Sequence, residues 1–271
     1  MKGTLYLVPS PIGNIDDVSP RAKQTLLNVD FVACEDTRNT LKLLNILGIS
    51  KKCVSCHEHN ESVASNSIIS NILDGQNVAY LSDAGYPCIS DPGYILAKKA
   101  IESGITVVPI SGASAFLNAL VGSGLDTKHF LFYGFLESKS SLRVKELEEL
   151  KHLTYTLIFY EAPHRLDECI KDIYKVFGNR NVCLCRELTK IHEEFIRTNL
   201  KDLIDNPPTL KGEIVIIVDK GVEVIKEEIS DKEIIAKVND LINNGLSKKD
   251  AIISVSILLN IPKNTIKKLV I

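Results

Sequence analysis

The chain has little net charge and no long hydrophobic run. Its 271 residues include 32 Lys and Arg against 34 Asp and Glu, a formal net charge of −2. This balance does not predict a polyanionic partner, so any contact with nucleic acid needs a local basic patch. No stretch approaches the ~20 apolar residues of a membrane helix, and the N-terminus reaches Pro and Gly too early for a signal peptide. We expect a cytoplasmic protein without membrane contacts.

Three familiar motifs are also missing. The first expected strand is not followed by G-x-G-x-x-G, and the chain contains neither G-x-x-x-x-G-K-S/T nor G-x-S-x-G. These absences exclude a dinucleotide or triphosphate bound in the usual ways, and a hydrolase nucleophile elbow.

The chain has seven cysteines, which is an odd number, and it is long enough to fold without stabilising disulfides. Reduced thiols are therefore expected. Cys53 and Cys56 precede His57 and His59, which suggests zinc, but this spacing crowds four ligands into seven residues. Zinc sites usually combine ligand pairs from separate segments. We expect no metal site, and a zinc-binding regulatory protein is an alternative that metal analysis would test.

Strand-like and helix-like segments alternate along the first half of the chain. Strands are expected at 4–8, 31–35, 53–56, 78–81 and 106–110, and helices at 18–29, 39–48, 62–75, 92–103 and from 112. Ser19 is a suitable N-cap before Pro20 at the first helical position. This alternation predicts an α/β fold with a mostly parallel sheet and helices on both faces.

The second half repeats this alternation with different lengths. Strands are expected at 129–136, 154–161, 181–188 and 213–219, and helices at 138–152 and 164–178. Gly122-Ser123-Gly124 indicates a break between two domains, 1–122 and 123–222. Residues 223–271 are expected to form only helices, with a break at Pro262 and five Lys against one Asp from residue 244. This tail fits either a basic helix-turn-helix-like element or a packing or dimerisation segment.

The segment VAYLSDAGYPCISDPG at 78–93 is the most informative part of the chain. A short buried strand leads into a loop rich in Gly, Pro, Ser and Asp, which cannot form regular structure. Most strand-to-helix connections are only a few residues long. The loop is therefore predicted to form a ligand site at the carboxyl end of the sheet.

Two further loops follow strands at the same predicted sheet edge. Pro9 to Asn14 follows the first strand, and Ser111 to Ala115 opens a helix after the fifth. Small residues let a ligand approach the backbone, and a helix N-terminus offers free N–H groups to a carboxylate or phosphate. An ordinary helix start explains the 111–115 segment taken alone, but three such loops together favour a binding cleft.

Six segments together resemble the group of the tetrapyrrole methylase superfamily that methylates small-subunit ribosomal RNA. In chain order they are VPSPIGN at 8–14, ACEDTR at 33–38, HEHNE at 57–61, LSDAGYPCISDPG at 81–93, IFYEAPHR at 158–165 and RELTK at 186–190. The resemblance implies a class III methyltransferase fold of two α/β domains, a homodimer, and S-adenosylmethionine bound in the cleft between the domains. It also implies methylation of the ribose 2′-hydroxyl of a decoding-region cytidine in 16S rRNA.

The resemblance assigns cofactor-binding roles along the three loops and in the second domain. The residues implied are Pro9, Gly13, Asp83, Ala84, Gly85, Pro87, Ser111, Gly112, Ala113, Ser114, Tyr160 and Glu161. Two departures stand out: the family usually has Thr where this chain has Tyr86, and Pro-Gly-Pro where it has Ser111-Gly112-Ala113. The glycines at these two places, Gly85 and Gly112, are kept.

Methyl transfer to a hydroxyl needs a group that takes or positions its proton. The candidates are Glu35, Asp36, His59, Glu161 and Glu187, and Asp36 is favoured because it follows an expected strand end. Arg38 beside Asp36 would lower the pKa of that carboxyl, which favours a purely structural ion pair. Arg38, Arg165, Arg186 and Lys190 are the cations expected to face RNA phosphate. The lack of net basicity favours an assembled small ribosomal subunit over free RNA as the partner.

Two other functions stay open on the sequence alone. A tetrapyrrole or other small molecule could be the methyl acceptor, or the chain could be a non-catalytic ribosome-binding factor with a degenerate cofactor site.

Overall fold

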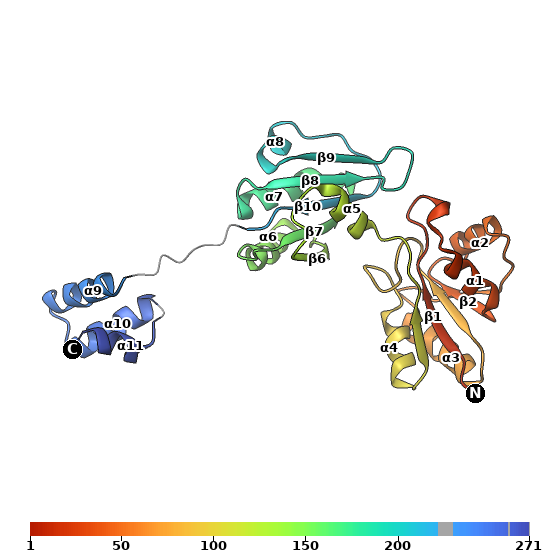
Figure 1. Ribbon diagram of the computed structural model, residues 1–271, viewed down its shortest axis with the longest axis horizontal. Helices are drawn as coiled ribbons and strands as arrows, with labels where there is room; N and C mark the ends of the chain where they lie inside the picture. The colour runs from red at the N-terminus through yellow and green to blue at the C-terminus, as the bar shows by residue number, and fades with distance from the viewer. Residues whose placement is uncertain (222–229, 260, 271) are drawn as a thin grey trace. The chain divides into compact units, whose positions relative to one another are not determined.

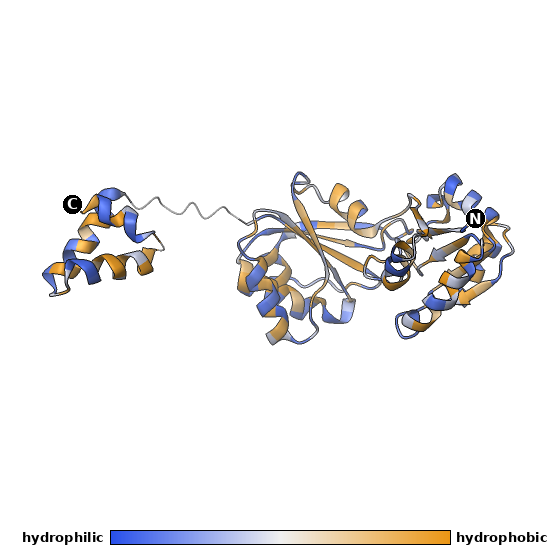
Figure 2. Cartoon of the chain, turned by 90° about the horizontal axis from the view of Figure 1, so that it is seen from below, coloured by the Kyte–Doolittle hydropathy of each residue, from blue (hydrophilic) through white to orange (hydrophobic). Residues whose placement is uncertain are grey.

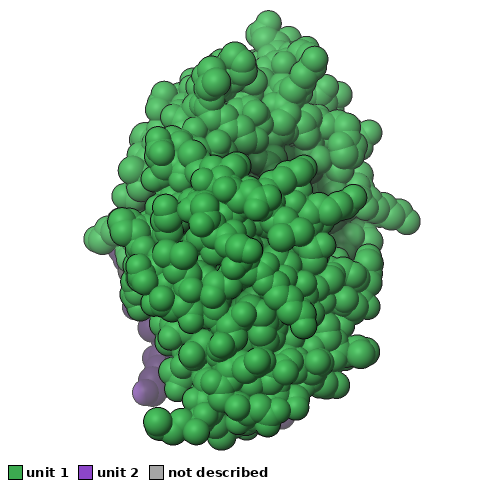
Figure 3. Space-filling view, turned by 90° about the vertical axis from the view of Figure 1, so that its right-hand side faces the viewer, with its two compact units in different colours: residues 1–222 green, residues 223–271 purple. Residues whose placement is uncertain are grey.

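The computed structural model describes residues 1–221, 230–259 and 261–270 (Figure 1). It divides into two compact units, Met1–Val222 and Glu223–Ile271, which Figure 3 colours separately. The expected boundary at 222/223 lies outside the described residues, and the division at 122/123 stays a prediction. Within the described ranges, no helix combines the length and apolar character that a membrane span requires.

The first sheet of the larger unit is entirely parallel, as predicted. Its strand order is β3-β2-β4-β1-β5. The strands are β1 Thr4–Val8, β2 Phe31–Cys34, β3 Cys53–Ser55, β4 Val78–Leu81 and β5 Thr106–Pro109. All residues of β2 and β4 are buried, because helices cover both faces of the sheet.

Two helices pack on each face of this sheet. Leu26 and Leu44 lie in the apolar cluster on one face, whereas Ile68 and Leu96 lie in the cluster on the other. The Ser19 hydroxyl accepts the Ala22 N–H at 3.1 Å and so caps the first helix, as its sequence predicts. The helices are α1 Pro20–Asn28 and α2 Thr37–Ile46 on the first face, and α3 Glu61–Leu73 and α4 Tyr94–Glu102 on the second.

The second sheet is mixed, in contrast to the parallel first sheet. Its order is β6-β7-β10-β8-β9, and only β6 and β7 run parallel. The strands are β6 Phe130–Phe135, β7 Thr156–Glu161, β8 Asn181–Arg186, β9 Glu194–Asn199 and β10 Ile214–Val218. Strand β9 was not predicted, because it lies at a sheet edge and its polar residues give no buried run.

Helices also cover both faces of the second sheet. One face packs against α6 Ser140–Leu150, α7 Leu166–Phe177 and α8 Leu200–Asp205. The other face packs against α5 Ala115–Ser123, whose Ala119 and Leu120 share a cluster with Ile158 and Val215. Helix α5 thus begins before the expected break and ends within it, at Ser123, and it packs on the second sheet.

The smaller unit consists of helices in its described residues. Helix α9 Asp231–Asn243 begins with a capping box between Ser230 and Glu233, and α10 Lys248–Leu259 and α11 Lys263–Leu269 flank Pro262 as predicted. Its core contains Ile234, Val238, Ala251, Ile252, Val255 and Ile266. Figure 2 shows hydrophobic residues alternating with hydrophilic ones along these helices.

Candidate functional site

The three glycine- and proline-rich loops of the first sheet meet at one edge. Ser10 and Gly85 pair through two backbone hydrogen bonds of 2.9 and 3.0 Å. The Gly112 N–H donates to the Tyr86 hydroxyl at 3.0 Å. Tyr86, which departs from the family pattern, therefore ties the second loop to the third. The expected common edge exists.

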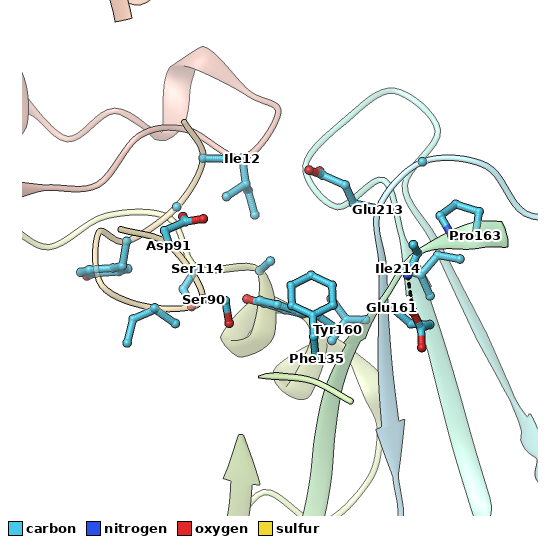
Figure 4. Close-up of a pocket in the computed structure, with 18 residues that line it drawn as sticks. Ile12, Ser90, Asp91, Ser114, Phe135, Tyr160, Glu161, Pro163, Glu213 and Ile214 are labelled. Atoms are coloured by element: carbon cyan, nitrogen blue, oxygen red, sulfur yellow. Dashed lines mark hydrogen bonds between the residues drawn. The ribbon is translucent and has the colours of Figure 1, made fainter. Parts of the chain in front are cut away.

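A cavity of about 300 Å³ opens where these loops face the second sheet (Figure 4). The first sheet contributes residues from all three loops, and the second sheet contributes the ends of β6 and β7 and the start of β10. The lining comprises Ile12, Ala84, Gly85, Tyr86, Ile89, Ser90, Asp91, Ser114, Ala115, Phe135, Tyr160, Glu161, Ala162, Pro163, Gly212, Glu213, Ile214 and Val215. This volume is within the range that holds small ligands.

Five of the twelve expected cofactor residues line this cavity: Ala84, Gly85, Ser114, Tyr160 and Glu161. The other seven (Pro9, Gly13, Asp83, Pro87, Ser111, Gly112 and Ala113) lie in the loops but not in the lining. Two of these glycines allow close packing instead. A Cβ on Gly112 would collide with the Pro9 ring, and one on Gly13 would collide with the Lys190 side chain.

The Gly13 contact joins the two sheets directly. A Cβ at this position would also stand 3.0 Å from Thr189 Oγ1 and 3.1 Å from the Leu188 carbonyl oxygen, both in the loop after β8. Ile12, the preceding residue, shares the apolar cluster of the second sheet with Leu188. This loop of the first sheet is therefore packed against the second.

Tyr160 and Phe135 form the aromatic wall of the cavity (Figure 4). Their rings contact edge to face, with centroids 5.5 Å apart. Burial raises the pKa of the Tyr160 hydroxyl to about 12, so it stays protonated at neutral pH.

Asp91 is a cavity residue that the sequence analysis did not single out. Desolvation, followed by repulsion from Glu35 and Asp83, raises the pKa of its carboxyl to about 7. Burial, followed by repulsion from nearby carboxylates such as Asp83, also raises the pKa of Glu35. The only sequence signal for Asp91 is its place in the SDPG segment of the long loop.

Asp36, a candidate for the catalytic base, does not line the cavity. It caps α2 by accepting the Arg38 N–H at 2.8 Å, and its carboxylate pairs with the Arg38 guanidinium at 2.7 Å. These hydrogen bonds from Arg38 lower the pKa of Asp36 to about 2, which leaves it a weak base. The neighbouring expected residue, Asp83, is exposed and accepts from Asn39 Nδ2 at 2.8 Å.

Glu161 lines the cavity but is engaged in a buried ion pair. Its side chain is 1% exposed and lies 3.1 Å from Arg165 Nε. It also accepts the Ala162 N–H at 2.8 Å, and Arg165 Nη2 donates to the Leu136 carbonyl at 2.8 Å. The pair therefore holds together the ends of β6 and β7 beneath the cavity.

The other cations expected to bind RNA differ in their exposure and in their ion pairs. Arg38 is 84% exposed at its side chain. Arg186 pairs with Glu194 at 2.6 Å, whereas Lys190 reaches both Glu187 at 3.0 Å and Glu213 at 3.3 Å.

The CxxC-H-x-H segment does not assemble a metal site. Among the described residues, no group of three or more His, Cys, Asp or Glu is placed to hold a metal ion. Glu61 of this region has a different role: its carboxylate accepts the N–H groups of Gly93 and Leu96, both at 3.0 Å. It therefore caps α4, whose own N-cap residue is glycine.

Known proteins similar to this chain are methyltransferases. The family described as Tetrapyrrole (Corrin/Porphyrin) Methylases matches residues 4–204. "Ribosomal RNA small subunit methyltransferase I" of Halalkalibacterium halodurans is 46% identical over 98% of this chain and 93% of that protein. The protein of the same name in Bacillus subtilis is 43% identical over 97% of this chain and 92% of its own length.

Two solved structures share the fold at low sequence identity. The uroporphyrin-III-C-methyltransferase of Thermus thermophilus is 18% identical, with a TM-score of 0.59 over 81% of this chain and 95% of that one. A diphthine synthase is 12% identical, with a TM-score of 0.62 over 80% of this chain and 90% of that one. The predicted α/β architecture with a small C-terminal helical segment is confirmed. The chain is a methyltransferase of the tetrapyrrole methylase family and belongs to its ribosomal RNA small subunit methyltransferase I group.

Proposed function

We propose that the protein transfers the methyl group of S-adenosylmethionine to the ribose 2′-hydroxyl of a decoding-region cytidine in 16S rRNA. The observation that carries the proposal is a ligand-sized cavity at the meeting of the three loops, in a chain 46% identical to a protein named for small-subunit rRNA methylation. The nucleotide and the ribose oxygen come from the resemblance of the six sequence segments.

The residues around the cavity fit this cofactor. Ile12, Phe135, Tyr160 and Ile214 give apolar and aromatic walls that suit an adenine ring. Asp91 supplies a carboxyl group within that apolar setting, which suits a cationic ligand. We propose that Ala84, Gly85 and Ser114 approach the cofactor through their backbones, while Pro9, Gly13, Ser111, Gly112 and Ala113 shape the loops.

The protein's contribution to the reaction is alignment and exclusion of water. When bound, S-adenosylmethionine supplies an electrophilic methyl group on a sulfonium. The cavity walls hold the donor in one orientation, so that a hydroxyl oxygen entering from the opposite side is aligned for displacement. Asp36 and Glu161 are retained as candidates for handling the hydroxyl proton, although both are engaged in ion pairs with arginine.

The acceptor is proposed to be 16S rRNA within an assembled small subunit in the cytoplasm. Arg38 is the cation most available for phosphate, because its side chain is 84% exposed. Like Arg38, which is paired with Asp36, the residues Arg165, Arg186 and Lys190 would have to exchange or share an acidic partner to bind RNA. We also propose a homodimer, which light scattering of the purified protein would test.

Methylation of isolated ribosomal subunits tests the proposal. Purified protein, labelled S-adenosylmethionine and small subunits from cells lacking the gene should give one labelled cytidine, mapped by mass spectrometry of 16S rRNA fragments. Labelling of a porphyrinogen but not of subunits would favour the small-molecule alternative. Binding to subunits without any methyl transfer would favour a ribosome-binding factor.

A further inference from the structure

Asp91 occupies a fixed place on the cavity wall. Figure 4 shows its side chain beside Ile12 and Ser114, on the opposite side of the cavity from Glu213. The backbone around it is constrained: Cys88 and Ser90 have positive φ of 70° and 59°, and the Cys88 N–H donates to the Pro92 carbonyl at 3.1 Å. Two residues later, the Gly93 N–H is held by buried Glu61. Such strained, over-determined loops commonly serve ligand sites.

The charged groups that influence Asp91 are acidic. Glu35 and Asp83 repel its ionised form from the loops after β2 and β4, and Glu213 does so from the start of β10. The neutral forms of Tyr160 and Cys88 are in turn favoured by a charge on Asp91. Within the part of the chain that the structure describes, the largest causes that shift the pKa of Asp91 include no cation, and Lys190 is engaged by Glu187 and Glu213. Asp91 thus lacks the counter-charge that a cationic ligand would bring.

We propose that Asp91 distinguishes the sulfonium-bearing methyl donor from its uncharged thioether product, by losing a proton when the donor binds and recovering it after methyl transfer. The inference rests on the proposed function and names a specificity-determining residue within that site. S-adenosylmethionine carries one more positive charge than S-adenosylhomocysteine, and nothing else of comparable size separates the two ligands except the methyl group. A carboxyl that titrates near neutrality converts this charge difference into an affinity difference.

The protons balance through the cycle. Donor binding releases one proton from Asp91 to solvent and leaves its carboxylate facing the cation. Methyl transfer breaks the sulfur–carbon bond, forms the oxygen–carbon bond and releases the hydroxyl proton to solvent. The sulfur keeps the bonding electron pair and becomes neutral, so Asp91 regains a proton from solvent. Because Asp91 is neutral again, the product gains none of the electrostatic attraction that the donor gains, and it binds more weakly than the donor.

Isothermal titration calorimetry in buffers of different ionisation enthalpy tests the proposal without using activity. With wild-type protein at pH 7, donor binding should release about half a proton from Asp91, because a group with a pKa of about 7 is half protonated there. For a drop of about one unit in the pKa of Asp91 on donor binding, the release should be largest between about pH 6 and 7, at roughly half a proton, and should vanish near pH 9. The amino groups of both ligands also titrate, so the measured quantity is the difference between wild type and Asp91→Asn.

The affinity ratio provides the second readout. If donor binding lowers the pKa of Asp91 by about one unit, Asp91→Asn should reduce the preference for S-adenosylmethionine over S-adenosylhomocysteine roughly tenfold at pH 8. Asp74→Asn, an exposed carboxyl at the end of α3, is the matched control and should leave both readouts unchanged.

The outcomes separate this inference from the proposed function. Binding of the donor with the same proton release and ligand preference in wild type and Asp91→Asn would overturn the role of Asp91 alone. A wild-type protein that binds neither ligand would overturn the cofactor assignment and, with it, this inference. If Asp91→Asn does not fold, the two ligands are compared on wild-type protein, and equal proton release on binding S-adenosylmethionine and S-adenosylhomocysteine at pH 7 refutes the proposal.

Discussion

Removing Arg165 should destabilise the protein and damage the cavity, not only RNA binding. The side chain of Glu161 is 1% exposed, so Arg165→Ala leaves a buried charge without its partner and also frees the Leu136 carbonyl. Breaking such a pair typically costs 3–5 kcal/mol. Because Arg165 itself is 24% exposed, we expect the lower end, about 3 kcal/mol.

The sequence alone favours a different outcome, in which Arg165 contacts RNA phosphate and its loss spares cofactor affinity. The structure predicts a parallel loss of donor affinity, because Glu161, Ala162 and Pro163 line the cavity. Urea unfolding measures the stability, and calorimetry with S-adenosylmethionine measures the affinity.

Two further variants sharpen this test. Adding Glu161→Gln to Arg165→Ala should restore part of the lost stability, since a neutral amide no longer buries a charge. Arg38→Ala removes an exposed guanidinium that is also ion-paired, and should change stability little. An unfolding free energy of Arg165→Ala within about 0.5 kcal/mol of wild type would show that the Glu161–Arg165 pair does not stabilise the fold.

Three other perturbations have defined outcomes. Gly112→Ala should cost roughly 1–3 kcal/mol and reduce donor affinity, because the new methyl group collides with the Pro9 ring; unchanged urea midpoint and affinity would contradict the packing. Arg38 lowers the pKa of Asp36 to about 2, so its stabilisation is present above the ordinary Asp value and is lost as pH falls toward 2. Asp36→Asn should therefore flatten the acid limb of thermal stability between pH 5 and 2, and an identical limb would argue against the pair. Burial raises the pKa of Asp91 to about 7, so its ionisation costs stability as pH rises through 7. Asp91→Asn should therefore be more stable than wild type at pH 8 but not at pH 4, and unfolding curves at the two pH values test this.

The first sheet was predictable because its strands are buried on both faces. Segments such as FVAC and VAYL read as short apolar runs bounded by turn residues, and their helices carry caps such as Ser19. The second sheet was less predictable. Strand β9 is an edge strand whose residues are only partly buried, and an antiparallel pair leaves no helix between β8 and β9 to mark it.

The candidate site was predictable in outline but not in its lining. Gly and Pro spacing indicated three loops at one sheet edge, and that edge exists. Asp91 and Glu213 were missed because only the folded chain brings them to the cavity. Asp91 places a carboxyl group among apolar walls, and Glu213 lies at the start of a strand that is distant in the sequence. Asp36 carried the more conspicuous local pattern, yet that pattern is explained by a helix cap and an ion pair.

The central position of β10 has a consequence for how the enzyme matures during its own synthesis. This strand, Ile214–Val218, lies between β7 and β8 and is the last to be translated, yet its first residues complete the cavity. A nascent chain that has emerged only as far as residue 212 leaves β7 and β8 without the partner that joins them. Under the proposed function, donor binding therefore has to wait until almost the whole of the larger unit has left the translating ribosome.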